Sequence, residues 1–331
     1  MNCISSTLDG VAIGSPQTHL NLTMFPLLGE KPVEIDYLLL DQALEQGAIE
    51  ISEVSDSGSV PTLKVLNKSI QRVLLLDGEE LVGAKQNRIL NVSVMIPAQK
   101  TITIPVSCVE AGRWHRQSET FASAGRTHFA EGRARKTRAV NQSIHHSKSR
   151  SGDQSEVWDR ISLKSARMQA RSSTDASDEM YRTFRSDLDS FHNAFQAVPN
   201  QIGAIFSLNE STTGIDLFEA TDALAASLNK LVESYALDAI DNLRRGMNGK
   251  SSFDAKKFLD DICAVTPEIH SAVGEGEDHR FDSGTLSGGG LVVDEKLVHL
   301  CAFHVVEENV HHPSRSRITR ASSRNRGRRR A

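Results

Sequence analysis

Apolar and polar residues alternate in two consecutive segments in the first third of the chain. Every second residue from Leu90 to Ile96 is apolar, and the same holds from Ile102 to Cys108. A period of two is typical of half-buried β-strands. The short link between the segments predicts that they pair antiparallel. Because proline cannot donate a ladder hydrogen bond, Pro105 places the second strand at a sheet edge or at a bulge.

Other strands are predicted by apolar runs that end in turn-forming residues. The first lies at 21–28 and is expected to end at Pro26, and a second follows Gly47 directly. Further strands are predicted at 62–67, 72–81 and 199–209, and two closing strands lie within 284–306. Apolar residues spaced by three and four predict helices. These are a short helix that stops at Gly47, one at 155–169 capped by Ser155, and others at 177–198 and 221–246. The dipeptide Asp77-Gly78 predicts a hairpin turn, since both residues tolerate positive φ.

The order of these elements predicts an α+β fold, with a mainly antiparallel β-sheet or barrel-like core and several packed helices. Residues 116–155 are polar and basic, and we expect a long loop region with short helices there. One domain is predicted over 10–306, with a β-rich part at 10–115 and a helical part with closing strands at 156–306. The arginine-rich C-terminal tail, 307–331, is expected to be disordered.

The composition is typical of a soluble globular protein, with 39% hydrophobic and 24% charged residues in a chain of 331. No apolar run reaches the roughly 20 residues that span a bilayer, and the first residues lack the pattern of a signal peptide. We therefore expect a cytoplasmic protein that does not bind a membrane. The four cysteines are widely spaced, which favours free thiols over disulfides or a zinc site.

Charge is distributed unevenly along the chain. The net charge is −4, but residues 313–331 carry eight arginines and no acidic residue, which leaves 30 basic and 42 acidic residues, a net of −12, in the remainder. Residues 112–171 hold ten arginines and three lysines against five acidic residues. A basic zone within an acidic protein favours the binding of an anionic ligand.

The segment GEELVGAKQNRILN, residues 78–91, concentrates hydrogen-bonding groups between apolar strands. It contains Glu79 and Glu80, followed by Lys85, Gln86, Asn87 and Arg88. If the strand pleat continues, Gln86 and Arg88 share a face with Leu90, and Glu110 shares a face with Cys108. Polar groups would then enter the end of an apolar interior, which is a common design for a binding pocket.

Each of these polar residues has a functional and a structural interpretation. Glu80 and Glu110 are candidates for acid–base catalysis, or they are a solvated charge and a structural ion pair with Arg88 or Arg113. The candidate ligand-binding residues, which could hold phosphate or ribose or stack a base, are Lys85, Gln86, Asn87, Arg88, Arg113, Trp114 and Gln154. Alternatively, they tie strand ends together, and Trp114 closes one end of the barrel.

Other reactive residue types give weaker signals. Cys108 lies on an apolar face, which favours an inert thiol over a nucleophile. Strand parity separates His304 from His299 and Cys301, so we predict no metal site there. Asp216 is expected at a helix N-terminus. The chain lacks the P-loop, HExxH and GxSxG motifs, and no cofactor can be named.

Several segments resemble one known family. They are LLLDGEELVGAKQNRILNVSVMIPAQKTITIPVSCVEAGRW (74–114), LTMFPL (22–27), DQSEVWDRI (153–161), TGIDLF (213–218) and LVHLCAF (297–303). Together they resemble the ARG and rhodanese-phosphatase-superfamily-associated protein domain, over roughly residues 10–305. The arginine-rich tail lies outside that pattern. The resemblance implies an association with ADP-ribosylglycohydrolases and with phosphatase-like proteins of the rhodanese superfamily.

Three functions are compatible with these observations. The resemblance favours a domain in the metabolism of ADP-ribose or related phosphorylated nucleotides, and an enzyme that acts on such a ligand would be one such domain. The alternative is a non-catalytic module that senses a nucleotide or docks onto a partner enzyme of ADP-ribose metabolism, because no compact nucleophile–base pair is present. A weaker alternative is association with nucleic acid through the arginine-rich tail.

Overall fold

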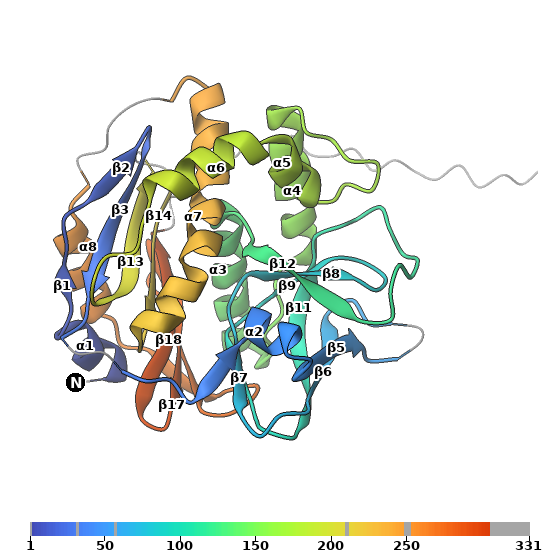
Figure 1. Cartoon of the computed structure of the whole chain (residues 1–331), viewed down its shortest axis with the longest axis horizontal. Helices are drawn as coiled ribbons and strands as arrows, with labels where there is room; N and C mark the ends of the chain where they lie inside the picture. The colour runs from blue at the N-terminus through green and yellow to red at the C-terminus, as the bar shows by residue number, and fades with distance from the viewer. Residues whose placement is uncertain (1, 31–32, 56–57, 209–211, 248–252, 305–331) are drawn as a thin grey trace, which may run out of the picture.

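Two groups of β-strands face each other, with helices packed between and around them (Figure 1). This computed structural model describes residues 2–30, 33–55, 58–208, 212–247 and 253–304. The strands pair almost entirely antiparallel, so the α+β fold predicted from the sequence is confirmed. The arginine-rich tail lies outside the described residues. Within the described residues, no helix is both long enough and apolar enough to cross a membrane.

Nine strands of the described chain form one large sheet, and the others form two smaller sheets. In spatial order the large sheet contains β1 (Ala12–Ile13), β3 (Leu22–Leu28), β13 (Gln201–Leu208), β14 (Thr212–Phe218), β18 (Lys296–His304), β17 (Leu286–Val293), β16 (Glu277–Asp282) and β15 (Glu268–Ser271), with β2 (Gln17–His19) beside β3. The six-stranded sheet contains β12 (Phe121–Thr127), β8 (Glu79–Gly83), β9 (Arg88–Leu90), β11 (Thr101–Cys108), β6 (Thr62–Asn67) and β5 (Ile49–Glu53). The three-stranded sheet contains β10 (Val94–Ile96), β7 (Arg72–Leu75) and β4 (Tyr37–Leu39), the last in a parallel pair with β7.

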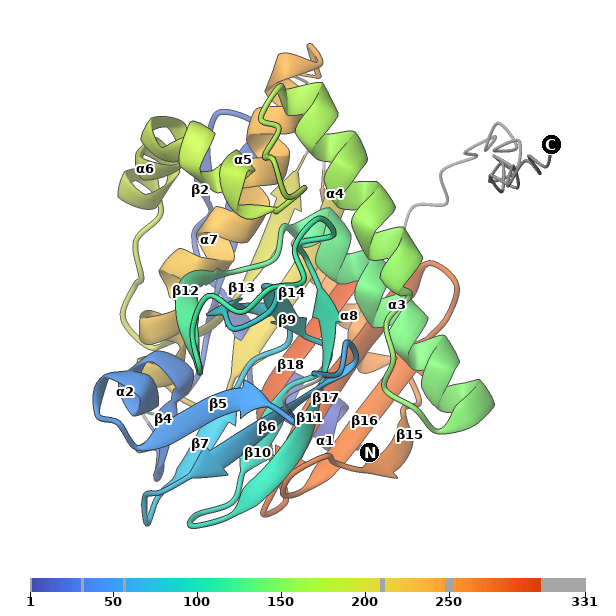
Figure 2. The ribbon, with the colours of Figure 1, turned by 90° about the vertical axis from the view of Figure 1, so that its right-hand side faces the viewer.

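The helices include two long ones near the centre of the molecule, α3 and α7 (Figure 1). In chain order the helices are α1 (Cys3–Leu8), α2 (Leu40–Glu45), α3 (Ala130–Ser147), α4 (Gln154–Met168), α5 (Asp178–Thr183), α6 (Arg185–Ala194), α7 (Thr221–Arg244) and α8 (Ala255–Cys263). Helices α3 and α4 run side by side, and α3 also packs on β16 and β17 (Figure 2).

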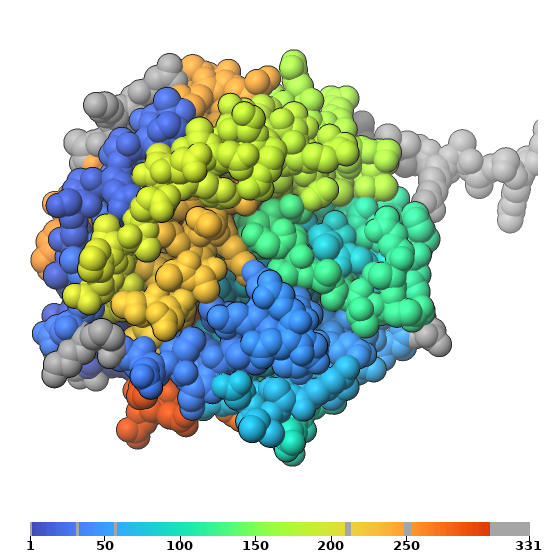
Figure 3. Space-filling model, viewed as in Figure 1, coloured from blue at the N-terminus to red at the C-terminus, as the bar shows by residue number. Residues whose placement is uncertain are grey.

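Helix α7 packs against β13 of the large sheet and β12 of the six-stranded sheet. Its predicted apolar stripe is confirmed, because Leu224, Leu231 and Tyr235 are fully buried. Gly246 ends the helix with a φ of +74°, a left-handed conformation that glycine adopts without strain. The segment that contains α2 lies against α7 on the face shown in Figure 3, where Asp41 contacts Lys230.

The region expected to be a long basic loop instead contains β12 and the 18-residue helix α3. The prediction of a long loop over 116–155 was wrong because helices were predicted from stripes of apolar residues. The inward side of α3 includes Arg133 and Lys136, and both side chains are fully buried. A helix whose buried face carries charge does not show the usual apolar periodicity.

Several predicted strand pairings differ from the structure. Gly78 adopts a turn conformation with a φ of +81°, but β7 and β8 belong to different sheets and do not form a hairpin. The alternating segments pair through β9 and β11, whereas β10 pairs with β7. Pro105 lies inside β11, at the point where the strand changes its partner from β6 to β9, and not on an edge strand. Strand β3 continues through Pro26 to Leu28.

The helix boundaries also needed correction. Helix α4 is capped by Asp153, whose carboxylate accepts hydrogen bonds from the backbone amides of Ser155 and Glu156. The helix predicted at 177–198 is divided at Phe184 into α5 and α6. Helix α8 and strands β15 and β16 were not predicted.

Candidate functional site

The two adjacent glutamates of the central motif are buried and belong to separate ion pairs. Glu80 is fully buried, and its carboxylate accepts two hydrogen bonds from Arg126, at 2.9 and 3.0 Å. The carboxylate of Glu79 lies 2.6 Å from the ammonium group of Lys230 and also accepts a hydrogen bond from the backbone amide of Leu76. The interpretation of this pair as solvated charges is therefore wrong.

The residues after Glu80 connect the β8–β9 turn to the end of β11. The Gln86 side-chain amide donates to the backbone carbonyl of Glu110 at 2.8 Å, and the Asn87 backbone amide donates to the Glu110 carboxylate at 3.2 Å. Arg88 donates to the Gln86 side-chain oxygen at 3.2 Å. These bonds bring together Gln86, Arg88 and Glu110.

Glu110 forms an ion pair with Arg113, with 2.6 Å between the carboxylate and Nη2. Of the two partners expected from the sequence, the structure selects Arg113. Burial alone would raise the pKa of Glu110, but the hydrogen bonds from Arg113, Thr174 and the Asn87 amide, together with the charge of Arg113, outweigh burial and lower it. Arg113 also donates to the Ala84 carbonyl and to the Asn87 side chain. Its guanidinium group therefore holds the turn in place.

Arg88 is fully buried, yet part of its guanidinium group has no hydrogen-bond partner. Among the described residues, none accepts a bond from its Nε or Nη2, and Glu53 is 4.0 Å away. Burial lowers the pKa of Arg88. The ring of Trp114 lies over this group, 5.8 Å from the guanidinium carbon and 5.4 Å from the Lys85 ammonium group. Trp114 itself is 48% exposed.

Gln154, at the start of α4, pairs with the backbone of β11. Its side chain accepts from the Cys108 amide and donates to the Cys108 carbonyl, both at 2.8 Å. Cys108 is fully buried, and burial raises its pKa. Both observations agree with an inert thiol. We name as the motif cluster the residues that these contacts assemble: Lys85, Gln86, Asn87, Arg88, Cys108, Glu110, Arg113, Trp114 and Gln154.

Glu80 lies outside the motif cluster. In addition to Arg126, it accepts a hydrogen bond from the Ser177 hydroxyl at 3.2 Å. Arg126 also contacts Asp178 at the start of α5, at 2.7 Å. Glu80 and Glu110 therefore face different arginines and do not act as one pair of carboxylates.

A second group of buried charges was not predicted from the sequence. Arg133 of α3 binds both carboxylate oxygens of Asp216, at 2.6 and 3.1 Å. Lys136, one turn later, contacts Asp77 at 2.7 Å. The buried ring of His299 lies 3.4 Å from Asp216. We name these five residues the α3 ion network. The spacing of Arg133 and Lys136 was the only signal for it in the sequence.

Asp216 lies in the middle of β14, so its predicted place at a helix N-terminus was wrong. Burial would raise its pKa, but the charge of Arg133 and the hydrogen bond from His299 lower it instead. Cys301, opposite Asp216 on β18, is also buried. Among the residues that the structure describes, no group of three or more His, Cys, Asp or Glu side chains could hold a metal ion.

Comparison with known proteins gives one match. The model of the ARG and Rhodanese-Phosphatase-superfamily-associated Protein domain matches residues 10–303. Neither the curated proteins nor the solved structures gave a match. The family is associated with proteins of the rhodanese-phosphatase superfamily. Because the match spans most of the chain, this protein belongs to the family of the ARG and Rhodanese-Phosphatase-superfamily-associated Protein domain.

Proposed function

We propose that the protein binds a phosphorylated nucleotide of the ADP-ribose type at the motif cluster. The observation that carries this proposal is the position of Trp114 over Arg88. A half-exposed aromatic ring covers a buried guanidinium group that has two nitrogens without a hydrogen-bond partner in the described structure. A buried donor without an acceptor costs free energy, about 1–3 kcal/mol, which a bound anion would recover.

The chemistry of the neighbouring residues supports a nucleotide. An exposed tryptophan offers a flat surface on which a base can stack. The guanidinium group of Arg88 and the ammonium group of Lys85, which lies over the same ring, offer positive charge to phosphate. Trp114 must move for a phosphate to reach Arg88. The family description names ARG, and the resemblance described above implies that this stands for ADP-ribosylglycohydrolases, which supports a ligand from ADP-ribose metabolism.

The two carboxylates favour binding over catalysis. Glu80 and Glu110 were candidates for acid–base chemistry, but each is held by an arginine, Arg126 and Arg113 respectively. The lowered pKa of Glu110 makes it a poor proton donor at neutral pH. We infer a module that senses the nucleotide and docks onto a partner enzyme, and the partner proposed is a protein of the rhodanese-phosphatase superfamily.

The test is calorimetric titration of the full chain with ADP-ribose, NAD and ADP. Trp114→Ala should weaken binding of the best ligand about tenfold, since stacking of one base contributes about 1–3 kcal/mol. Arg88→Ala should weaken it further. Arg182→Ala serves as the control, because this side chain is 74% exposed and its ion pair within the described residues is the local one with Glu179. The Arg182→Ala variant should bind the nucleotide with the affinity of the wild type.

Two results would contradict the proposal. If none of the three nucleotides binds the wild-type protein, the ligand class is wrong. If a nucleotide binds but Trp114→Ala and Arg88→Ala leave its affinity unchanged, the site is wrong. Product analysis of the same mixtures distinguishes binding from catalysis, because a module that only binds the nucleotide leaves it chemically unchanged.

A further inference from the structure

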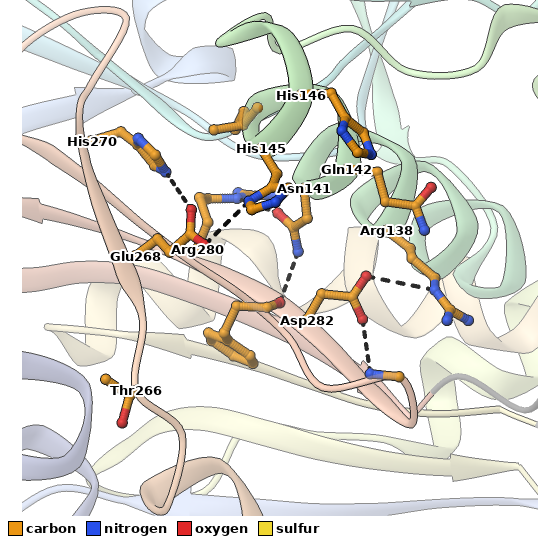
Figure 4. Close-up of a pocket in the computed structure, with 13 residues that line it drawn as sticks. Arg138, Asn141, Gln142, His145, His146, Thr266, Glu268, His270, Arg280 and Asp282 are labelled. Atoms are coloured by element: carbon orange, nitrogen blue, oxygen red, sulfur yellow. Dashed lines mark hydrogen bonds and ion pairs between the residues drawn. The ribbon is translucent and has the colours of Figure 1, made fainter.

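A polar groove lies between α3, the edge strand β15 and its neighbour β16, apart from the motif cluster. Its volume is about 440 Å³, within the range of small-molecule sites. Figure 4 shows side chains from the helix and from the strands pointing into it. The charged and titratable residues that line it are Arg138, His145, His146, Glu268, His270, Arg280 and Asp282.

Arg280 of β16 is a buried cation at this groove. The residue is only 4% exposed. Its Nε donates to the side-chain oxygen of Asn141 at 2.7 Å, and its Nη1 lies 3.5 Å from Asp278. Among the described residues, none accepts a hydrogen bond from its Nη2. One face of the guanidinium group therefore retains an unused donor.

The surrounding residues fix the orientation of Arg280. Besides accepting from Arg280, Asn141 donates from its side-chain nitrogen to the carbonyls of Phe281 and Gly288 and to the Ser287 hydroxyl, at 2.8 to 3.1 Å. These bonds fasten α3 to β16 and β17. Gly289 of β17 leaves the space in which the guanidinium group lies, because a Cβ at this position would collide with Nη1. The arginine is therefore held before any ligand arrives.

The other charges near the groove already have partners. Asp278 is shared between Arg280 and Arg150, with 2.9 Å to Arg150. Asp282 lies 3.6 Å from Arg138. Because Asp278 is shared between two arginines, it neutralises the guanidinium group of Arg280 only in part. A guanidinium group that is only partly neutralised favours an anion at the free Nη2.

Glu268 opposes an anion in the same groove. Its two carboxylate oxygens lie 3.4 Å from His145 and 3.5 Å from His270. Its side chain is 57% exposed, so solvent weakens its field without removing it. Glu268 is therefore a charge whose removal should change the affinity for an anion and for a cation in opposite directions.

From this geometry we infer that the groove is a second ligand site, which binds the phosphate group of a small molecule through the guanidinium group of Arg280. Arginine suits this role, since its planar fork matches the oxygens of a phosphate. The groove and the motif cluster are lined by different residues, so this inference does not depend on the function proposed for the motif cluster.

Inorganic pyrophosphate is the probe, titrated calorimetrically into the full chain. The measurements use Arg88→Ala as the background, so that the motif cluster does not contribute. Arg280→Gln should weaken pyrophosphate binding at least about tenfold, as expected for loss of a charge-assisted hydrogen bond. Glu268→Gln should tighten it roughly threefold, because a competing negative charge is removed.

Each outcome decides the inference. Tighter binding in Glu268→Gln together with weaker binding in Arg280→Gln supports it. If Arg280→Gln fails to fold, the exposed Glu268→Gln variant decides alone. Absence of pyrophosphate binding, an unchanged affinity in Arg280→Gln, or an affinity that is not raised in Glu268→Gln would overturn it.

Discussion

Replacement of Asp216 by asparagine tests whether the α3 ion network stabilises the fold. The change is nearly isosteric and removes one negative charge from a pair whose side chains are both 0% exposed. Arg133 would lose both of its short bonds to a carboxylate, and His299 would lose a charged neighbour. Among the described residues, the remaining charged contact of Arg133 would be Asp77, at 3.8 Å, which already binds Lys136. Asp77 can therefore compensate only in part.

Removal of one partner from a buried ion pair costs about 3–5 kcal/mol. Because Asp77 compensates in part, we expect a loss near the lower end, about 3 kcal/mol, for Asp216→Asn. With a denaturant dependence of about 3 kcal/mol per molar urea, the unfolding midpoint should fall by about 1 M. Urea titration followed by far-UV circular dichroism measures this shift directly.

Asp189→Asn is the matched control, because Asp189 pairs with Arg185 on the surface of α6, where both side chains are more than half exposed. It should cost no more than about 0.5 kcal/mol. The double variant Arg133→Met/Asp216→Leu, which leaves no unpaired charge, should be more stable than Asp216→Asn. A midpoint for Asp216→Asn equal to that of the surface control would refute this account of the network.

Two further predictions concern the motif. Because the folded-state pKa of Glu110 lies below its unfolded value, the unfolded chain binds the proton more readily, and the ion pair with Arg113 adds stability above roughly pH 5. In urea titrations from pH 6 to pH 3, the advantage of wild type over Glu110→Gln should shrink as the pH falls, and a constant difference would contradict it. Gly78→Ala places a Cβ at a φ of +81° and 3.0 Å from Arg133, so it should cost about 1–3 kcal/mol in the same assay; an unchanged midpoint would show that the turn relaxes freely.

Sequence patterns predicted the elements whose buried faces are apolar. Helix α7 and strand β13 were found because apolar residues repeat along their buried faces, although α7 also buries Lys230, Glu233, Asp238 and Asp241. Helix α3 was missed because Arg133 and Lys136 point inward and find acidic partners on strands and turns far away in the sequence. Periodicity reports where apolar side chains lie, and it does not report which charges a fold will pair.

Within the motif cluster, only contacts between residues close together in the sequence could be predicted. The ion pair between Glu110 and Arg113 joins residues three apart and was one of the two pairings expected from the sequence. The partner of Glu80 was not, since Arg126 belongs to the region taken for a loop. Gln154 was expected to reach a ligand, but its side chain is occupied by the backbone of Cys108. Contacts of this kind depend on the packing of α4 against β11, which no local pattern indicates.

The strand order of the large sheet has a consequence for synthesis of the protein on the ribosome. Strand β3 pairs with β13, from much later in the chain, and β18, the last strand described, lies between β14 and β17. The middle of this sheet therefore stays open until the end of β18 has been translated. A nascent chain, or a product truncated after residue 247, would expose the hydrogen-bonding edge of β14, and exposed edges promote aggregation. Chaperones should accordingly be needed until the last strand is in place.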